Sequence, residues 1–226
     1  MKTELASERS VIVYHDEPIG AQTTAQLQYL GKQIKSALGE QLLDLVQSYQ
    51  SLLVIFNPRL SSHPSVIKII EQCIENLPTG SMATHQQLVR LPVYYHEEVG
   101  PDLERIASHH KLTIEQVIER HCSQAYQVYA IGFAPGFAYL GEVASDIAMP
   151  RLKSPRPKVA KGSVGIADQQ TAIYPAASPG GWNLIGRCPI ELFNPEQTPA
   201  MPFNVGDNVQ FSAINKDEFI NLGGIL

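Results

Sequence analysis

Arginine residues in loops rich in glycine and proline are the groups in this sequence best suited to chemistry. Arg151, Arg156 and Arg187 each carry a planar guanidinium group, which can hold a carboxylate or a phosphate through two parallel hydrogen bonds. Glycine permits unusual backbone angles and proline fixes them, so loops rich in both are rigid. Binding sites are often built on rigid loops. The three loop segments span residues 132–141, 150–157 and 174–187.

The loop from Ser178 to Trp182 contains two consecutive glycines. Gly180 and Gly181 leave their backbone N–H groups unobstructed, and such groups can converge on an anionic oxygen. An anion site is one interpretation of this pattern, and the closing of a barrel by arginines that bind backbone carbonyls is the other. Trp182, the only tryptophan, fits a core or interface anchor better than a stacking platform for substrate.

Familiar catalytic and metal-binding motifs are missing from the sequence. It contains no GxSxG motif, no Walker A loop, no HExxH and no GxGxxG after a strand. Cys73, Cys122 and Cys188 are far apart and lack the spacing of metal ligands, so we expect reduced thiols. His109 and His110 are adjacent and would point in different directions on a helix. We therefore expect no metal site.

Composition and charge limit the class of protein. The 226 residues are 44% hydrophobic and 17% charged, which is typical of a globular protein with one large or two modest domains. A net charge of -5 gives no reason to bind nucleic acid or an anionic membrane surface. We find no signal peptide pattern and no apolar run long enough to span a membrane. The expected location is the cytoplasm.

The amino-terminal part of the chain alternates between strand and helix periodicity. Together the elements have the order of a split βαβ unit, which predicts a ferredoxin-like domain over residues 1–85. Our preferred interpretation of this domain is a packing module without a site of its own. The expected elements are a strand at 11–13, a helix at 27–38, a hairpin of 42–46 and 52–56, a helix from 62 to 77 and a strand at 88–94.

The pattern changes in the second part of the chain, residues 86–226. Thr113 and Gln116 have the spacing of a capping box, which predicts a helix running towards His121. Short β-rich runs separated by glycine and proline follow, and they predict a barrel or a sandwich. The expected strands include 126–131, 164–166, 172–174 and 209–211.

Three blocks of this second part are specific enough to compare with a known family. The blocks GFAPGFAYLG, PRLKSPRPKVAKGSVGIADQQTAIYP and SPGGWNLIGRCPIELFNP resemble the allophanate hydrolase subunit 1 domain, which is the domain of the KipI family and of 5-oxoprolinase B subunits. The resemblance extends over nearly the whole chain. It implies an α+β protein with a ferredoxin-like N-terminal domain followed by a cyclophilin-like β-barrel domain.

The resemblance also implies an activity that needs other subunits. Members of the family work with the A and C subunits of 5-oxoprolinase to open 5-oxo-L-proline to L-glutamate at the expense of ATP. This chain would then be a non-autonomous subunit of an ATP-hydrolysing cyclic amide hydrolase, with ATP required by the complex. The alternative is a KipI-type inhibitor that binds a sensor histidine kinase without catalysis. A stand-alone binder of small molecules is a third possibility.

Individual roles follow from the positions that match the family. As catalytic candidates, His121 is expected to carry a proton, and Arg151 and Arg156 to hold a substrate or phosphate anion. A structural role is an equally good interpretation of His121. The loop from Ser178 to Gly181 is expected to stabilise a developing oxyanion. The candidates for substrate binding are Ser178, Gly180, Gly181, Trp182 and Arg187, and Gly136 also matches the family.

Overall fold

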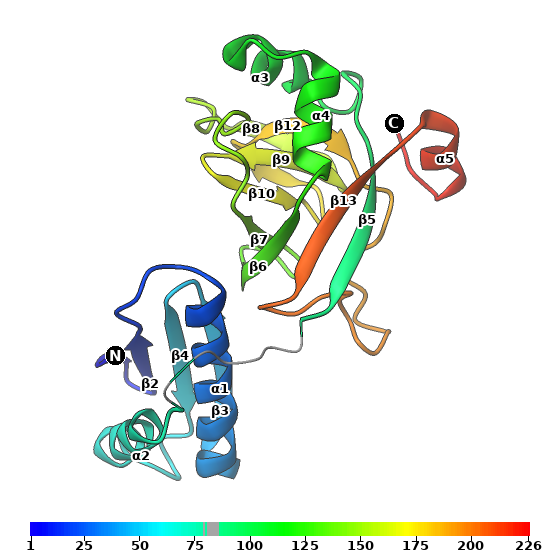
Figure 1. Ribbon diagram of the computed structural model, residues 1–226. Coiled ribbons are helices and arrows are strands. Elements are labelled where there is room, and N and C mark those ends of the chain that lie inside the picture. Colours follow the sequence, from blue (N-terminus) through cyan, green and yellow to red (C-terminus); the bar gives the residue numbers. More distant parts are fainter. Residues whose placement is uncertain (79, 81–85) are drawn as a thin grey trace. The chain divides into compact units, whose positions relative to one another are not determined.

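A computed structural model describes residues 1–78, 80 and 86–226 of the chain (Figure 1). The chain divides into two compact units, residues 1–85 and 86–226. Each unit has a hydrophobic core of its own. That each unit folds as an independent domain stays a prediction.

Unit 1, residues 1–85, is an antiparallel sheet packed against two helices. The strand order is β1-β2-β4-β3, and both helices contact the sheet and each other. Alternate residues of the strands, such as Val11 and Val54, face the helices, which bury Leu27 and Ile70 against them. The elements are β1 (Lys2–Ser7), β2 (Ser10–Tyr14), α1 (Ala21–Leu38), a short 3₁₀ helix (Gly39–Gln41), β3 (Leu42–Ser48), β4 (Ser51–Phe56) and α2 (His63–Glu75).

One predicted strand of unit 1 belongs elsewhere. The strand β5 (Leu88–Tyr94) pairs along its whole length with β13 (Asn208–Ile214) of unit 2, and the strand β1 lies at the edge of the first sheet beside β2. Counting 88–94 as the last strand of the split βαβ pattern was therefore wrong, although the expected domain boundary at residue 85 already left this strand outside. The period of a strand shows which residues share a face, and it does not show which sheet the strand will join. The ferredoxin-like assignment stays a prediction.

Unit 2, residues 86–226, is a closed barrel of seven strands, which confirms the predicted barrel and the α+β class. The strand order is β6-β13-β5-β12-β9-β10-β7, and the pairing of β6 with β7 closes the barrel. Closure leaves no unpaired sheet edge. The further strands are β6 (Ala125–Ile131), β7 (Ala138–Gly141), β9 (Ser163–Ala167), β10 (Gln170–Ile173) and β12 (Asn183–Arg187).

Three helices pack on the barrel (Figure 1). Helices α3 (Leu103–His110) and α4 (Ile114–Cys122) contact each other and the strands β12 and β13, and α5 (Lys216–Asn221) contacts β5. The predicted capping box of α4 is confirmed: Thr113 Oγ1 accepts from the Gln116 N–H at 3.2 Å, and Gln116 Oε1 accepts from the Thr113 N–H at 2.9 Å.

A small second sheet joins two of the loops rich in glycine and proline. Strand β8 (Arg156–Val159) pairs antiparallel with β11 (Ser178–Gly180), and the register shifts between Ser178 and Gly180. The Leu152 N–H also donates to the Gly181 carbonyl at 2.7 Å. These bonds hold the segment after Pro150 against the segment that ends at Trp182.

Candidate functional site

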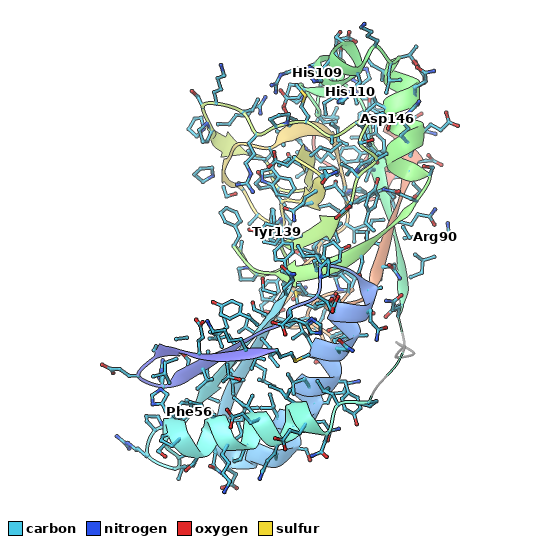
Figure 2. The ribbon with its side chains drawn as sticks, turned by 60° about the vertical axis from the view of Figure 1, so that its left-hand side comes forward. Phe56, Arg90, His109, His110, Tyr139 and Asp146 are labelled. Atoms are coloured by element: carbon cyan, nitrogen blue, oxygen red, sulfur yellow. The ribbon has the colours of Figure 1, made fainter. Side chains whose placement is uncertain are left out.

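A pocket of about 120 Å³ lies where the three loop segments meet. Aromatic rings form much of its wall, and one arginine, Arg151, reaches it. Tyr139, on β7, is labelled in Figure 2. We call this site the aromatic pocket. Its lining residues are Phe133, Phe137, Tyr139, Arg151, Tyr174, Pro179, Gly180, Gly181 and Trp182.

Arg151 and Trp182 form a cation–π pair in the aromatic pocket. The Arg151 Cζ atom lies 5.7 Å from the centroid of the Trp182 ring. Trp182 is 5% exposed and packs edge-on against Phe137. The Arg151 side chain is 57% exposed, and its ion partner Asp168 is 3.9 Å away. Because an arginine stacked on a ring keeps the edge of its guanidinium group free, Arg151 can still bind an anion.

Gly180 and Gly181 have different roles in the loop. A Cβ atom on Gly180 would lie 2.3 Å from the hydroxyl of Tyr174, so only glycine lets this ring approach. The Tyr174 hydroxyl also hydrogen-bonds with the Trp182 backbone, and burial raises its pKa. A Cβ atom on Gly181 would have no neighbour closer than 3.7 Å. A methyl group at Gly181 would therefore fit in ordinary contact with Leu152 and Pro155, so packing does not require glycine there.

The guanidinium group of Arg156 forms hydrogen bonds with other residues of unit 2. Its Nη2 donates to Asp102 Oδ1 at 2.8 Å, and its Nη1 donates to the Trp182 carbonyl at 3.4 Å. The other carboxylate oxygen of Asp102 accepts from the Leu184 N–H at 2.7 Å. Since Asp102 is buried, this pair fastens β8 to β12 and to the start of α3. The geometry makes Arg156 a support of the pocket wall.

Asn183 holds the chain immediately before Arg151. Its side chain is buried and its Nδ2 donates to the carbonyls of Pro150 at 3.0 Å and Ile166 at 2.9 Å. Its Oδ1 accepts from Arg105. Neither Asn183 nor Asp102 was predicted from the sequence. The position of Asn183 directly after Trp182 was a usable signal, whereas Asp102 lies 54 and 82 positions from its partners and gave none.

Ser178 and Gly136 lie near the aromatic pocket without lining it. Ser178 pairs with Val159 in the small sheet, and its buried Oγ has no hydrogen-bond partner among the residues described. Gly136 has a φ angle of 84°, and a Cβ atom there would lie 2.8 Å from the Cβ of Phe193. Both positions shape the loops, and neither residue lines the aromatic pocket.

Arg187 lies in a different place from Arg151. Its Nη1 donates to the Ile225 carbonyl at 2.7 Å, and it lines a second pocket of about 340 Å³. This second pocket shares no lining residue with the aromatic pocket. The structure therefore separates two arginines that the sequence pattern had grouped as one anion site.

His121 is part of the barrel core. Its side chain is completely buried, its ring stacks on Phe211, and it hydrogen-bonds with the Tyr95 hydroxyl at 2.7 Å and with Thr171 Oγ1 at 2.9 Å. Desolvation lowers the pKa of His121 to about 3. The ring is therefore neutral at ordinary pH, and the structure does not bring it to the aromatic pocket.

The histidines and cysteines outside the aromatic pocket are further candidates for metal ligands or reactive groups. Within residues 1–78, 80 and 86–226, no group of three or more His, Cys, Asp or Glu residues could hold a metal ion. His109 and His110, at the end of α3 (Figure 2), contact each other, and His110 Nε2 lies 2.8 Å from the Ala148 carbonyl oxygen. The cysteines are free thiols. No helix in the described part of the chain is long and apolar enough to cross a membrane.

The fold and the loops define a class of protein. Residues 1–203 match the family model of the carboxyltransferase domain, subdomain C and D. The urea carboxylase of Kluyveromyces lactis has the same fold: its structure superposes on 97% of this chain and 22% of its own chain with a TM-score of 0.79 at 17% identity. At that identity the likeness concerns the fold alone. The chain is thus a member of the carboxyltransferase-domain family.

Relatives with higher sequence identity show which branch of this family the chain belongs to. The chain is 34% identical to the B subunit of 5-oxoprolinase from Bacillus subtilis, over 96% of this chain and 94% of the relative. The solved structure of TTHA0988 is 32% identical with a TM-score of 0.80, and the match covers 92% of this chain and 40% of TTHA0988. This chain therefore belongs to the family of 5-oxoprolinase B subunits. The relatives give no support to a kinase inhibitor.

Proposed function

We propose that this chain is the B subunit of an ATP-dependent 5-oxoprolinase, a complex that opens 5-oxo-L-proline to L-glutamate. The observation that carries the proposal is the exposed guanidinium group of Arg151 over Trp182, in a chain whose relative is named for this activity. The substrate carries a carboxylate and a small flat amide ring. A guanidinium group can bind the carboxylate, and an aromatic wall can pack against the flat ring.

Within the aromatic pocket, Arg151 binds the negative charge of the substrate or of its activated intermediate. Opening a cyclic amide builds negative charge on the amide oxygen, and fixed donors near that oxygen lower the barrier. The backbone N–H of Gly181, which lines the pocket, can take this part, with Ser178 and Gly180 shaping the loop. Trp182 forms the wall on which Arg151 stacks.

The other predicted catalytic residues act by holding this arrangement. Arg156 is a positioning residue, because its hydrogen bonds end on Asp102 and on the Trp182 carbonyl. His121 packs in the barrel core and hydrogen-bonds with Tyr95 and Thr171. As a neutral buried ring it does not transfer a proton to or from substrate. We assign Arg187 to a separate site.

The aromatic pocket does not fit ATP. A pocket of about 120 Å³ is well below the roughly 300–1,000 Å³ of sites for larger ligands. The sequence has no Walker A loop to cradle phosphates. We therefore propose that ATP is bound and hydrolysed elsewhere in the complex, and that the A and C subunits supply the remainder of the catalytic site. This chain alone would then lack activity.

The finer description of the two units is part of this proposal. In unit 1, β1 occupies the sheet edge beside β2, the place that the last strand of a split βαβ unit would take. We propose that unit 1 is a ferredoxin-like domain modified in this way, and that the barrel of unit 2 is cyclophilin-like.

Reconstitution tests the proposed function. The chain is mixed with purified A and C subunits of the same complex, ATP and 5-oxoproline, and the release of glutamate and ADP is measured. We expect both products in equal amounts, and neither when any one of the three proteins is left out. Turnover that does not depend on this chain, or no turnover with well-folded partners, would contradict the proposal.

A further inference from the structure

The second pocket of unit 2, of about 340 Å³, has the size of a site for a small organic molecule. It lies between the end of β12, the following segment and the residues after α5. Its wall is mostly apolar, with Pro189, Ile190 and Phe219 on it. We call it the Arg187 pocket. It is lined by Ala160, Lys161, Arg187, Cys188, Pro189, Ile190, Phe219, Gly223, Gly224, Ile225 and Leu226.

The guanidinium group of Arg187 makes little use of its donors. Of its five N–H groups, the single hydrogen bond found among the described residues runs from Nη1 to the Ile225 carbonyl. Its Nε is buried without a partner, and no carboxylate of the described chain lies within 4.0 Å of it. Burial also lowers the pKa of Arg187. A charge removed from water without a counter-ion is costly, and an added anion would offset that cost.

The charges around the pocket favour an anion. The other cation of the wall, Lys161, is already paired with Glu191 at 2.8 Å. No aspartate or glutamate of the described chain lines the pocket. Among the side chains of the wall, Arg187 is therefore the positive group without an ion partner, and it is set among apolar residues.

We infer that the Arg187 pocket binds a small organic carboxylate with a short apolar body. Its carboxylate accepts hydrogen bonds from the unused N–H groups of Arg187, and its body packs on Pro189, Ile190 and Phe219. The site does not depend on the proposed function, because it shares no residue with the aromatic pocket.

The test uses the full chain and two probes, hexanoate and the uncharged 1-hexanol. Binding is followed by ¹H–¹⁵N NMR on isotope-labelled protein, which reports where each probe acts. We expect hexanoate to shift the amide signals of residues 160–162, 187–190 and 219–226 in a saturable way, and to bind about tenfold or more tightly than 1-hexanol.

Two variants separate this pocket from the first one. Arg187→Gln keeps a polar side chain and removes the guanidinium charge, and it should weaken hexanoate binding about tenfold or more. The matched control Arg151→Gln should leave the hexanoate-induced shifts around the Arg187 pocket unchanged. No saturable shift in the wild type, shifts that map elsewhere, or equal binding of both probes would overturn the inference. The wild-type map decides the matter even if Arg187→Gln does not fold.

Discussion

Three arginines of the barrel unit meet three different environments. Arg151 is mostly exposed and stacks on a ring, Arg156 is paired with a buried carboxylate, and Arg187 is half-buried with one carbonyl as its partner. The guanidinium group of Arg151 is the one that can bind substrate without breaking a buried pair, since its ion partner Asp168 is exposed and 3.9 Å away. Breaking a buried pair such as that of Arg156 would cost more than a small anion returns.

His121 gives a prediction about acid stability. Its pKa in the folded chain, about 3, lies below its ordinary value of 6.5, so between these values the unfolded chain binds a proton that the folded chain does not. The stability that His121 contributes is therefore complete above pH 6.5 and falls as the pH drops, by about 1.4 kcal/mol per pH unit.

Urea denaturation at pH 7.5, 5.5 and 4.5 measures this effect. The comparison variant is His121→Gln, whose amide can serve Tyr95 and Thr171 without titrating. We expect the stability difference between wild type and variant to shrink steadily below pH 6.5. A difference that stays constant across the three pH values would show that His121 is not held neutral.

The two adjacent glycines make a matched pair for mutation. Gly180→Ala places a Cβ atom against the ring of buried Tyr174, and we expect a loss of about 2 kcal/mol in the free energy of unfolding. Gly181→Ala meets no close neighbour and should change it by less than about 0.5 kcal/mol. Equal effects in urea denaturation would contradict the different roles described for them.

At the scale of elements, one buried cluster holds the loops of the aromatic pocket. Asp102 joins the start of α3 to β12 and, through Arg156, to β8. Asn183 joins β12 to β9 and to the chain before Arg151. The pocket is thus assembled by side chains outside it, which makes the position of Arg151 dependent on residues that touch no substrate.

Asp102→Asn tests this cluster. Asparagine removes the charge opposite Arg156 and turns an N–H group towards another donor, so we expect a loss of about 2 kcal/mol in the free energy of unfolding. The control is Asp146→Asn, at a residue labelled in Figure 2, which breaks the more exposed pair with Arg120 and should cost less than about 0.5 kcal/mol. If urea denaturation gives the two variants the same stability, the cluster does not hold the loops together.

Local patterns predicted most elements well, since local interactions form them. The capping box of Thr113 and the hairpin of 42–46 with 52–56 are confirmed because their partners are close in the sequence. The partner of 88–94 is more than a hundred residues away, at 208–214, and no local pattern encodes that pairing. The same limit applies to the site: the loops were predicted, and the separation of Arg187 from Arg151 was not.

At the scale of the whole molecule, the protein has the features of a component that is completed by others. The aromatic pocket is small and open at its surface, with Phe133 on its rim 66% exposed. The related TTHA0988 chain is longer, and this chain corresponds to 40% of it. Aromatic residues are enriched on surfaces that a partner covers, and Phe133 lies beside the pocket that we propose for substrate. We therefore expect full affinity for substrate only in the assembled enzyme.

The most direct measurement is the KM for 5-oxoproline of the assembled enzyme that carries Arg151→Gln. The matched control is Arg59→Gln, an exposed arginine of unit 1. We predict that KM rises about tenfold to a hundredfold for Arg151→Gln, because the hydrogen bonds to the substrate anion are lost, and that the control leaves KM unchanged. A KM for Arg151→Gln equal to that of the control, in a complex that still turns over, would contradict the account of the aromatic pocket.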